Sequence, residues 1–331
     1  MFWRLMPPTE LRERACMMIG AQQANASSTQ TRVVVFVHVH YLEIWQEITQ
    51  ALADRMDVDF WLVVTSSLTA ELPAPNTPRL QSMTKLLVEN RGRDILPFLT
   101  ALEKVGDFDI GLKLHTKKSP QRSDGGAWRV ELLDKLLPRQ GVGAFLKNLS
   151  ADSRIGFVAP DGFSLSVAPW IFVNRMPMDR AMAALGHVLQ EKDFENAFFA
   201  AGSMFWFRRA ALAELATPVI IALFEREDGQ LDGTIAHGME RLFPVEAKRQ
   251  NFVSTAMSCV DADSPRLSHA EIIAAARAAA DRPNIYFPAP GVSAGAPSVV
   301  PEPVLLTIGL DEHLRRLCPG WLKALLRYLR R

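Results

Sequence analysis

The sequence lacks the features that several large protein classes require. Its three cysteines, Cys16, Cys259 and Cys318, are far apart and odd in number, so neither a disulfide framework nor a zinc site is predicted. No apolar run approaches the roughly eighteen residues of a membrane span, and prolines and charges interrupt the first twenty residues, where a signal peptide would be apolar. We therefore expect a cytoplasmic protein.

An excess of either charge is also missing. Lysine and arginine number 37, and aspartate and glutamate number 36, in 331 residues. Because no global field results, nucleic acid is not an expected partner, and any positive site must be local. The HExxH, CxxC and GxxxxGK[ST] patterns are absent, which argues against a zinc protease, a zinc ribbon and a P-loop NTPase.

Short apolar runs alternate with helical patterns along most of the chain. The β-branched run at 33–39 predicts a strand buried on both faces, and a four-residue apolar repeat over 44–56 predicts a helix. Further strands are predicted at 60–64, 86–88, 108–115, 154–160 and 203–207, with helices between them. This alternation predicts a Rossmann-like α/β fold with a mainly parallel sheet, whose ligands bind at the carboxyl ends of the strands.

Composition divides the chain into four predicted parts. A lead-in at 1–31 precedes an α/β domain at 32–255, an Ala-rich helix with a Pro/Gly-rich linker at 256–310, and a basic amphipathic helix at 311–331. The segment 161–198 is predicted to be irregular, as a lid or a capping insertion. The last helix either lies on the inner face of the cytoplasmic membrane through 319–331 or docks on its own domain.

The first of two basic clusters is ENRGRD, at residues 89–94. Gly92 permits a sharp turn, Arg91 and Arg93 flank it, and Asp94 is placed to cap the helix that follows. A helix N-terminus beside two guanidinium groups predicts an anion site, most simply for phosphate. The alternative is a capped turn whose arginines are solvated or paired with neighbouring carboxylates.

The second basic cluster is LKLHTKKSP, at residues 112–120. Strand alternation places Lys113 and His115 on one face, while Lys117 and Lys118 continue into the loop. A buried lysine without a partner would lose its proton, so the pattern predicts an anionic ligand between these cations. The alternative is an exposed basic loop on an edge strand.

The order of the two clusters is similar to that in GT-A glycosyltransferases. There an Asn/Arg/Gly segment opens a helix, and the next strand ends in an Asp-x-Asp motif whose metal neutralises the donor diphosphate. Here basic residues stand at that place, so we predict that side-chain cations replace the metal and that no cofactor is needed. The predicted diphosphate ligands are Arg91, Arg93, Lys113, His115, Lys117 and Lys118, and the predicted pocket-shaping residues are Asn90, Gly92, Asp94 and Thr116.

A transferase also needs a base for the acceptor hydroxyl. A helix predicted over 230–243 carries Asp232 and Glu240 on one face, about 12 Å apart, so only one can be the base. Asp232, at the start of this helix, is the candidate, and an ordinary helix N-cap is the alternative. One carboxylate suffices for an inverting displacement. Candidates for the acceptor or sugar side are Gly202, Ser203, His237 and Glu240.

Two further patterns are interpreted as core packing. His38 and His40 alternate with valines and face one side of the first strand, which is more typical of core histidines than of ligands, although a nucleotide base is an alternative. The aromatic residues at 198–199 and 205–207 are interpreted as core rather than as a platform for sugar stacking.

Seven segments, taken in chain order, resemble the rhamnan synthesis protein F family of bacterial polysaccharide-assembly proteins: VVVFVHVHY, VENRGRDILPFLTAL, LKLHTKKSP, GAWR, IGFVAP, AGSMFWFRRAAL and QLDGTIAHGMERLF. The resemblance runs from about residue 31 to 252. It implies a glycosyltransferase, with L-rhamnose as the expected sugar, that uses a nucleotide diphosphate donor and extends O-antigen or cell-wall glycan on a lipid carrier. A non-catalytic scaffold that binds a nucleotide sugar or glycan is the alternative, because the Asp-x-Asp motif is missing.

Overall fold

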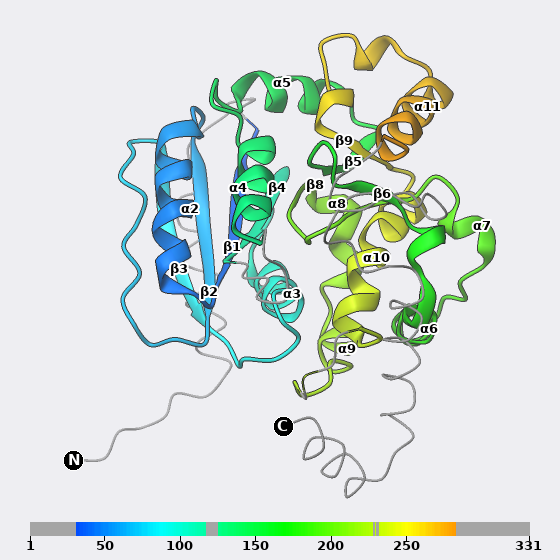
Figure 1. The fold of residues 1–331 in the computed structure, drawn as a ribbon, viewed down its shortest axis with the longest axis horizontal. Coiled ribbons are helices and arrows are strands. Elements are labelled where there is room, and N and C mark those ends of the chain that lie inside the picture. The colour runs from blue at the N-terminus through cyan, green and yellow to red at the C-terminus, as the bar shows by residue number, and fades with distance from the viewer. Residues whose placement is uncertain (1–30, 117–124, 228, 230–231, 283–331) are drawn as a thin grey trace, which may run out of the picture.

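A seven-stranded sheet forms the centre of the protein, in the order β3-β2-β1-β4-β8-β5-β9, and β6 and β7 form a separate pair (Figure 1). The computed structural model describes residues 31–116, 125–227, 229 and 232–282. The strands are β1 (Val33–Val39), β2 (Phe60–Ser66), β3 (Leu80–Leu87), β4 (Ile110–His115), β5 (Ile155–Ala159), β6 (Ser164–Ser166), β7 (Phe198–Ala200), β8 (Phe205–Arg208) and β9 (Val253–Ala256). The helices are α2 (Leu42–Arg55), α3 (Ile95–Lys104), α4 (Gly125–Leu136), α5 (Gly143–Ala151), α6 (Arg175–Ala184), α7 (Glu191–Phe194), α8 (Arg209–Leu212), α9 (Pro218–Ile221), α10 (Ile235–Arg249) and α11 (His269–Ala280).

The sheet is mainly parallel. Strands β3, β2, β1 and β4 pair in parallel, β8 runs antiparallel between β4 and β5, and β5 pairs in parallel with β9. The predicted α/β class and mainly parallel sheet are therefore confirmed, and the arrangement is compatible with a GT-A-like fold. Every residue of β1 is buried, as its β-branched run predicts. The register places His38 of β1 beside His115 of β4, at the carboxyl ends of both strands.

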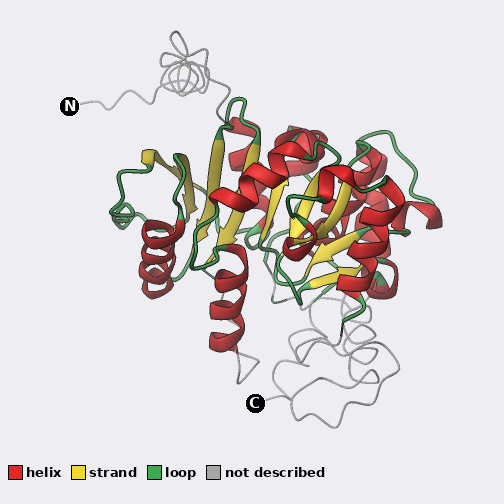
Figure 2. Ribbon diagram, turned by 90° about the horizontal axis from the view of Figure 1, so that it is seen from above, coloured by secondary structure: helices red, strands yellow, loops and turns green. Residues whose placement is uncertain are grey.

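Helices cover both faces of the sheet (Figure 2). Val33, Val35 and Val37 of β1 share one buried cluster with side chains of α2, α4 and α5. Val34 and Phe36 belong to a second cluster with α3 and α10. The aromatic residues at 198–199 and 205–207 are buried, so they are core residues, as predicted.

Two predicted elements need correction. The edge strand β3 spans Leu80–Leu87 rather than 86–88, because its solvent-facing polar residues hide it from an apolar pattern. The segment 161–198 is not irregular: it contains β6, α6, α7 and β7, and its apolar residues, among them Met178 and Phe199, are buried in one cluster with residues of α10. The predicted Ala-rich helix is α11. Within the described ranges, no helix has both the length and the apolar character needed to cross a bilayer.

Candidate functional site

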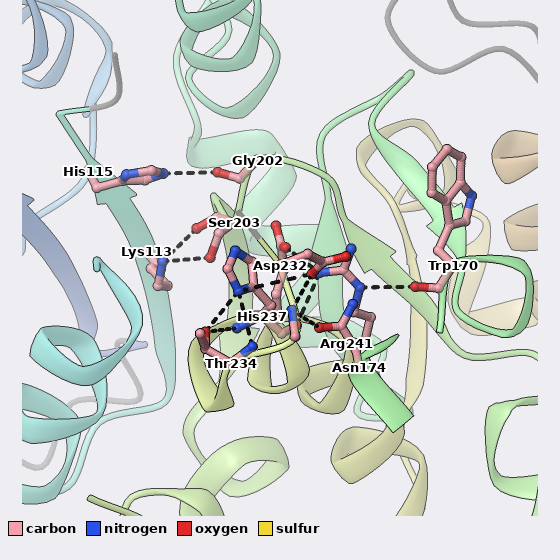
Figure 3. Close-up of polar contacts among 12 residues, drawn as sticks. Lys113, His115, Trp170, Asn174, Gly202, Ser203, Asp232, Thr234, His237 and Arg241 are labelled. Atoms are coloured by element: carbon pink, nitrogen blue, oxygen red, sulfur yellow. Dashed lines mark hydrogen bonds and ion pairs between the residues drawn. The ribbon is translucent and has the colours of Figure 1, made fainter. Parts of the chain in front are cut away.

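Polar residues from four parts of the chain meet near the carboxyl end of β4. They come from the loop before α3, from β4 itself, from the turn before β8, and from the turn that opens α10. Figure 3 shows residues from the last three of these parts. Left-handed backbone angles gather here: Gly92, Arg93, Gly202, Ser203 and Gly233 all have positive φ. Such angles carry strain for residues other than glycine, and they cluster at functional sites.

Lys113 is the centre of the buried part of this site. Its side chain is only 1 % exposed, and its Nζ donates to a carboxylate oxygen of Asp94, to the Ser203 carbonyl oxygen at 2.6 Å, and to the Ser203 Oγ at 2.9 Å. An ammonium group has three N–H donors, so all three are used within the protein. Burial lowers the pKa of Lys113, and the Asp94 charge opposes that change. The anion that the sequence predicts beside this lysine is thus internal.

His115 extends the same buried network. Its Nε2 lies 2.9 Å from the Gly202 carbonyl oxygen, and its Nδ1 lies 3.7 Å from an Asp94 carboxylate oxygen. The prediction that Lys113 and His115 share one face of this strand is confirmed, because both side chains reach Asp94 and the Gly202–Ser203 turn. The alternative of an edge-strand loop is wrong, since β4 pairs on both sides, with β1 and β8.

Thr116 and His38 complete the buried side. Thr116 Oγ1 accepts hydrogen bonds from the backbone nitrogens of His40 and Tyr41, at 2.8 and 3.0 Å, and so ties the loop after β1 to β4. His38 is buried, with its Nδ1 3.1 Å from the Thr65 hydroxyl. Burial lowers the pKa of His38 to about 4, so the ring is neutral at neutral pH.

The ENRGRD turn has a constrained backbone and an open outer face. A Cβ on Gly92, whose φ is +64°, would lie 2.5 Å from the Leu96 Cβ and 2.6 Å from a Phe224 ring carbon, so only glycine fits without a shift. Arg93 is exposed, and its backbone nitrogen donates to Glu227 at 3.1 Å. Arg91 is half-buried and pairs with Glu89 at 3.3 Å, as the alternative interpretation of this cluster predicts, while Asn90 is exposed.

The predicted cap of α3 is wrong. The helix begins at Ile95, as predicted, and Asp94 occupies the N-cap position, but its side chain makes no capping hydrogen bond. The carboxylate turns to Lys113 instead, because a buried ammonium needs a counter-charge more than a helix end needs one acceptor.

The helix that carries the predicted base starts later than the sequence pattern indicates. Helix α10 begins at Ile235, and Thr234 caps it by accepting from the His237 nitrogen. Asp232 therefore lies in the preceding turn and is not the N-cap. Its Oδ1 accepts from the Gly233 nitrogen at 2.9 Å and lies 4.0 Å from His237 Nδ1, and its side chain is 27 % exposed.

His237 stands between Asp232 and the Lys113–Ser203 pair (Figure 3). Its Nδ1 accepts from the Thr234 nitrogen at 3.4 Å and lies 2.8 Å from the Thr234 hydroxyl. Burial lowers the pKa of His237 to about 3; the Arg93 charge adds to this effect and the Asp232 charge opposes it. The ring is therefore neutral at neutral pH, with its proton on Nε2, which has no partner among the described residues.

Glu240 is held away from an acid–base role by its own partner. Its carboxylate accepts from Arg241 Nη1 at 2.8 Å, and Arg241 Nε donates to the Trp170 carbonyl oxygen at 3.2 Å. Its negative charge also favours the charged form of Lys113. Glu240 thus balances two cations, whereas Asp232 is paired with no arginine or lysine in the described part of the chain.

The structure brings most predicted site residues together. The Arg93 charge acts on His237, and the Asp94 charge acts on both Lys113 and His237, so the two basic clusters and the α10 turn form one electrostatic unit. Lys117 and Lys118 lie outside the described residues. Within those residues, no three His, Cys, Asp or Glu side chains are grouped so that they could hold a metal ion, and metal independence stays a prediction.

Sequence reasoning missed two members of the site. Asn174, just before α6, accepts from the Gly233 nitrogen, and Glu227 accepts from the Arg93 nitrogen. Asn174 is separated from its partner by 59 residues, so no local spacing connects them. The only available signal was a polar residue inside the aromatic stretch APWIFVNRM.

Comparisons with known proteins give a family match and similar sequences. The family model for rhamnan synthesis protein F matches residues 12–251. The chain is also similar to the uncharacterized protein WxcX of Xanthomonas campestris pv. campestris, strains B100 and ATCC 33913, with 37 % identity over 212 residues in each case. These matches cover 62 % of this chain and 30 % of each relative, so the chain spans less than a third of the length of the curated relatives.

Proposed function

We propose that the chain is a glycosyltransferase, because it belongs to the rhamnan synthesis protein F family. Membership of this family implies a part in the synthesis of rhamnan and related polysaccharides. In this proposal the chain moves a sugar, with L-rhamnose as the first candidate, from a nucleotide diphosphate donor to a growing glycan such as O-antigen on a lipid carrier.

One observation carries the proposal: an exposed arginine, and a carboxylate that pairs with no lysine or arginine among the described residues, both act on the same neutral histidine at the carboxyl end of the sheet. Arg93 faces outward, Asp232 is partly exposed, and His237 lies within the field of both. Ligands of α/β sheets bind at this end, and a transferase needs positive charge for a leaving diphosphate beside a base for the acceptor.

The reaction assigns separate tasks to these groups. Asp232 accepts the proton of the acceptor hydroxyl while that oxygen attacks the anomeric carbon of the donor sugar. The bond from this carbon to the diphosphate oxygen breaks, and Arg91 and Arg93, with the predicted Lys117 and Lys118, stabilise the leaving diphosphate. His237, whose Nε2 is buried, stands beside Asp232 as a neutral ring. A single carboxylate makes this an inverting displacement.

Lys113 and His115 take a different role from the one that their sequence pattern predicts. Because Lys113 has no donor left for a phosphate, we assign it and His115 to holding the Asp94 loop and the Gly202–Ser203 turn together beneath the pocket. The same observation favours a second candidate function, a scaffold that binds a nucleotide sugar without turnover, because it reduces the cations available to a leaving diphosphate.

Turnover separates the two functions. The purified chain would be incubated with dTDP-L-rhamnose, and with UDP- and GDP-sugars, in the presence and absence of EDTA, and released nucleoside diphosphate would be measured. An enzyme releases it slowly without acceptor and at equal rates with EDTA. Thermal stabilisation by a donor with no release would identify the scaffold, and loss of turnover in EDTA with recovery on adding a divalent ion would end the metal-free proposal.

Membrane contact through residues 319–331 is a separate proposal about a segment outside the described residues. Its pattern of Trp321 and leucines opposite basic residues suits an anionic lipid surface. Flotation with vesicles of phosphatidylglycerol and phosphatidylcholine, for chains with and without these residues, tests it. Equal binding of both chains would overturn it.

A further inference from the structure

The α-helices of the described chain differ in how their N-cap residues are used. Thr217, Thr234 and Ser268 each accept a hydrogen bond from the backbone of their own helix. Asp94 and Asn174 occupy the same position before α3 and α6, and neither side chain caps its helix. Aspartate and asparagine are among the best N-caps, worth about 1 kcal/mol. Both therefore forgo a local contact, and both are turned toward the candidate site.

The side-chain oxygen of Asn174 accepts a hydrogen bond from the turn that carries the proposed base, Asp232. Asn174 is fully buried, and its Oδ1 accepts from the Gly233 nitrogen at 3.2 Å (Figure 3). The same nitrogen donates to Asp232 Oδ1 at 2.9 Å. One N–H thus joins the amide oxygen of Asn174 to the carboxylate of Asp232.

The turn itself needs such support. Gly233 has a φ of +73°, a region that glycine enters without strain but does not prefer over its other conformations. On its far side, the Thr234 nitrogen donates to His237 Nδ1. Asn174 therefore accepts from the Gly233 N–H, and His237 accepts from the next one, that of Thr234. The two acceptors come from different elements, and Asp232 is the residue just before these two N–H groups.

We propose that Asn174 is a positioning residue for Asp232, acting through the Gly233 N–H; this inference rests on the proposed function. The orientation of the amide follows from its partner, because only Oδ1 can accept from an N–H donor. Its Nδ2 then has no partner among the described residues. A buried donor left unmatched costs about 1–3 kcal/mol, which an apolar residue of similar size would avoid. Compared with an apolar residue, the Asn174 amide therefore adds only the hydrogen bond to the Gly233 nitrogen.

Two substitutions test the proposal. Asn174→Leu keeps the branched shape of the side chain and removes the acceptor, and Asn174→Asp keeps the acceptor. Met176→Ala, at a side chain that is 69 % exposed in helix α6 just after Asn174, is the matched control. Hydrogen exchange at the Gly233 amide would be measured first, because it needs no substrate. It should become faster in Asn174→Leu and stay unchanged in Met176→Ala.

Kinetics with the active donor then test the link to Asp232. Asn174→Leu should lower kcat about 10- to 100-fold, because the base is misplaced, with the donor KM nearly unchanged. Asn174→Asp should retain much of the activity, and the acid limb of its kcat–pH profile should move to higher pH, because a second carboxylate raises the pKa of the first. Packing alone would not explain a loss of kcat in Asn174→Leu together with its retention in Asn174→Asp.

The outcomes separate this inference from the proposed function. Unchanged exchange at Gly233 in Asn174→Leu overturns the inference, and so does faster exchange with an unchanged kcat. If the unmodified chain turns over no donor, the proposed function fails and so does the catalytic part of the inference. The exchange measurement would still decide whether Asn174 holds the turn.

Discussion

Lys113 and Arg93 are both cations from basic clusters at one end of the sheet, and their surroundings are opposite. Lys113 is buried among Asp94, Ser203 and the rings of Phe98 and Phe205, and every one of its donors is used. Arg93 is exposed on a left-handed backbone, and its charge reaches His237. The first cation is part of the protein's internal bonding, whereas the second is exposed to solvent.

This difference shows what a basic cluster at a strand end means. A cation on a strand buried on both faces must obtain its counter-charge from the fold, because removing a charge from water costs several kcal/mol unless it is paired. A cation on an exposed loop, such as Arg93 between β3 and α3, has no such constraint and can bind a ligand. In the proposed function, the buried side supports the candidate pocket and the open side performs the chemistry.

The largest expected effect is on the open side. Asp232→Asn removes the proposed base while keeping its shape, and turnover should fall by about 10²- to 10⁴-fold with donor affinity unchanged. Stability should change little, because this side chain is partly exposed and contacts no lysine or arginine in the described part of the chain. Steady-state release of nucleoside diphosphate measures it. Glu240→Gln is the control, and an equal loss in both variants would remove Asp232 from its role.

The buried side should respond in stability instead. Lys113→Met leaves the Asp94 carboxylate without its main partner and should cost about 3–5 kcal/mol in the free energy of unfolding. Urea denaturation measures the loss. The double variant Lys113→Met/Asp94→Asn should recover part of it, because no unpaired charge remains. A single variant as stable as the original chain would mean that the pair does not hold the two loops together.

A smaller effect should appear in acid. The folded protein keeps His38 neutral, with a pKa of about 4, whereas the unfolded chain has the ordinary value of 6.5. Between these values the unfolded state binds more protons, so this stabilisation is complete above pH 6.5 and is lost as the pH falls toward 4. His38 alone should account for about 1–2 kcal/mol between pH 7 and 5. Denaturation of His38→Asn should show a flatter pH dependence, whereas His269→Asn, at an exposed position, should keep the original slope.

Much of the fold could be predicted because its signals are local. The β-branched run of β1 and the four-residue apolar repeat of α2 each determine their own element. The edge strand β3 was mostly missed because half-exposed residues carry little apolar pattern. The start of α10 was misplaced because Asp232 and Thr234 are both good N-caps, and only the tertiary structure selects Thr234.

The sequence was enough to predict which residues gather at the site, but not which of them contact one another. Strand alternation correctly placed Lys113 and His115 together, and chain order correctly brought the ENRGRD loop near them. The partner of Lys113 could not be predicted, because the same Asp94 also suited the cap of α3 and only burial decides between the two. Asn174 could not be predicted at all, since its contact with Gly233 spans 59 residues.

The division between a supporting side and a binding side is tested most directly by the affinity for a nucleoside diphosphate. Isothermal titration with dTDP and UDP would compare the unmodified chain with Arg93→Ala, on the open side, and His115→Gln, on the buried side. The account predicts that Arg93→Ala weakens binding about 10-fold or more, as loss of a charge-assisted contact should, while His115→Gln leaves it nearly unchanged. Unchanged affinity in Arg93→Ala, together with a large loss in folded His115→Gln, would contradict it.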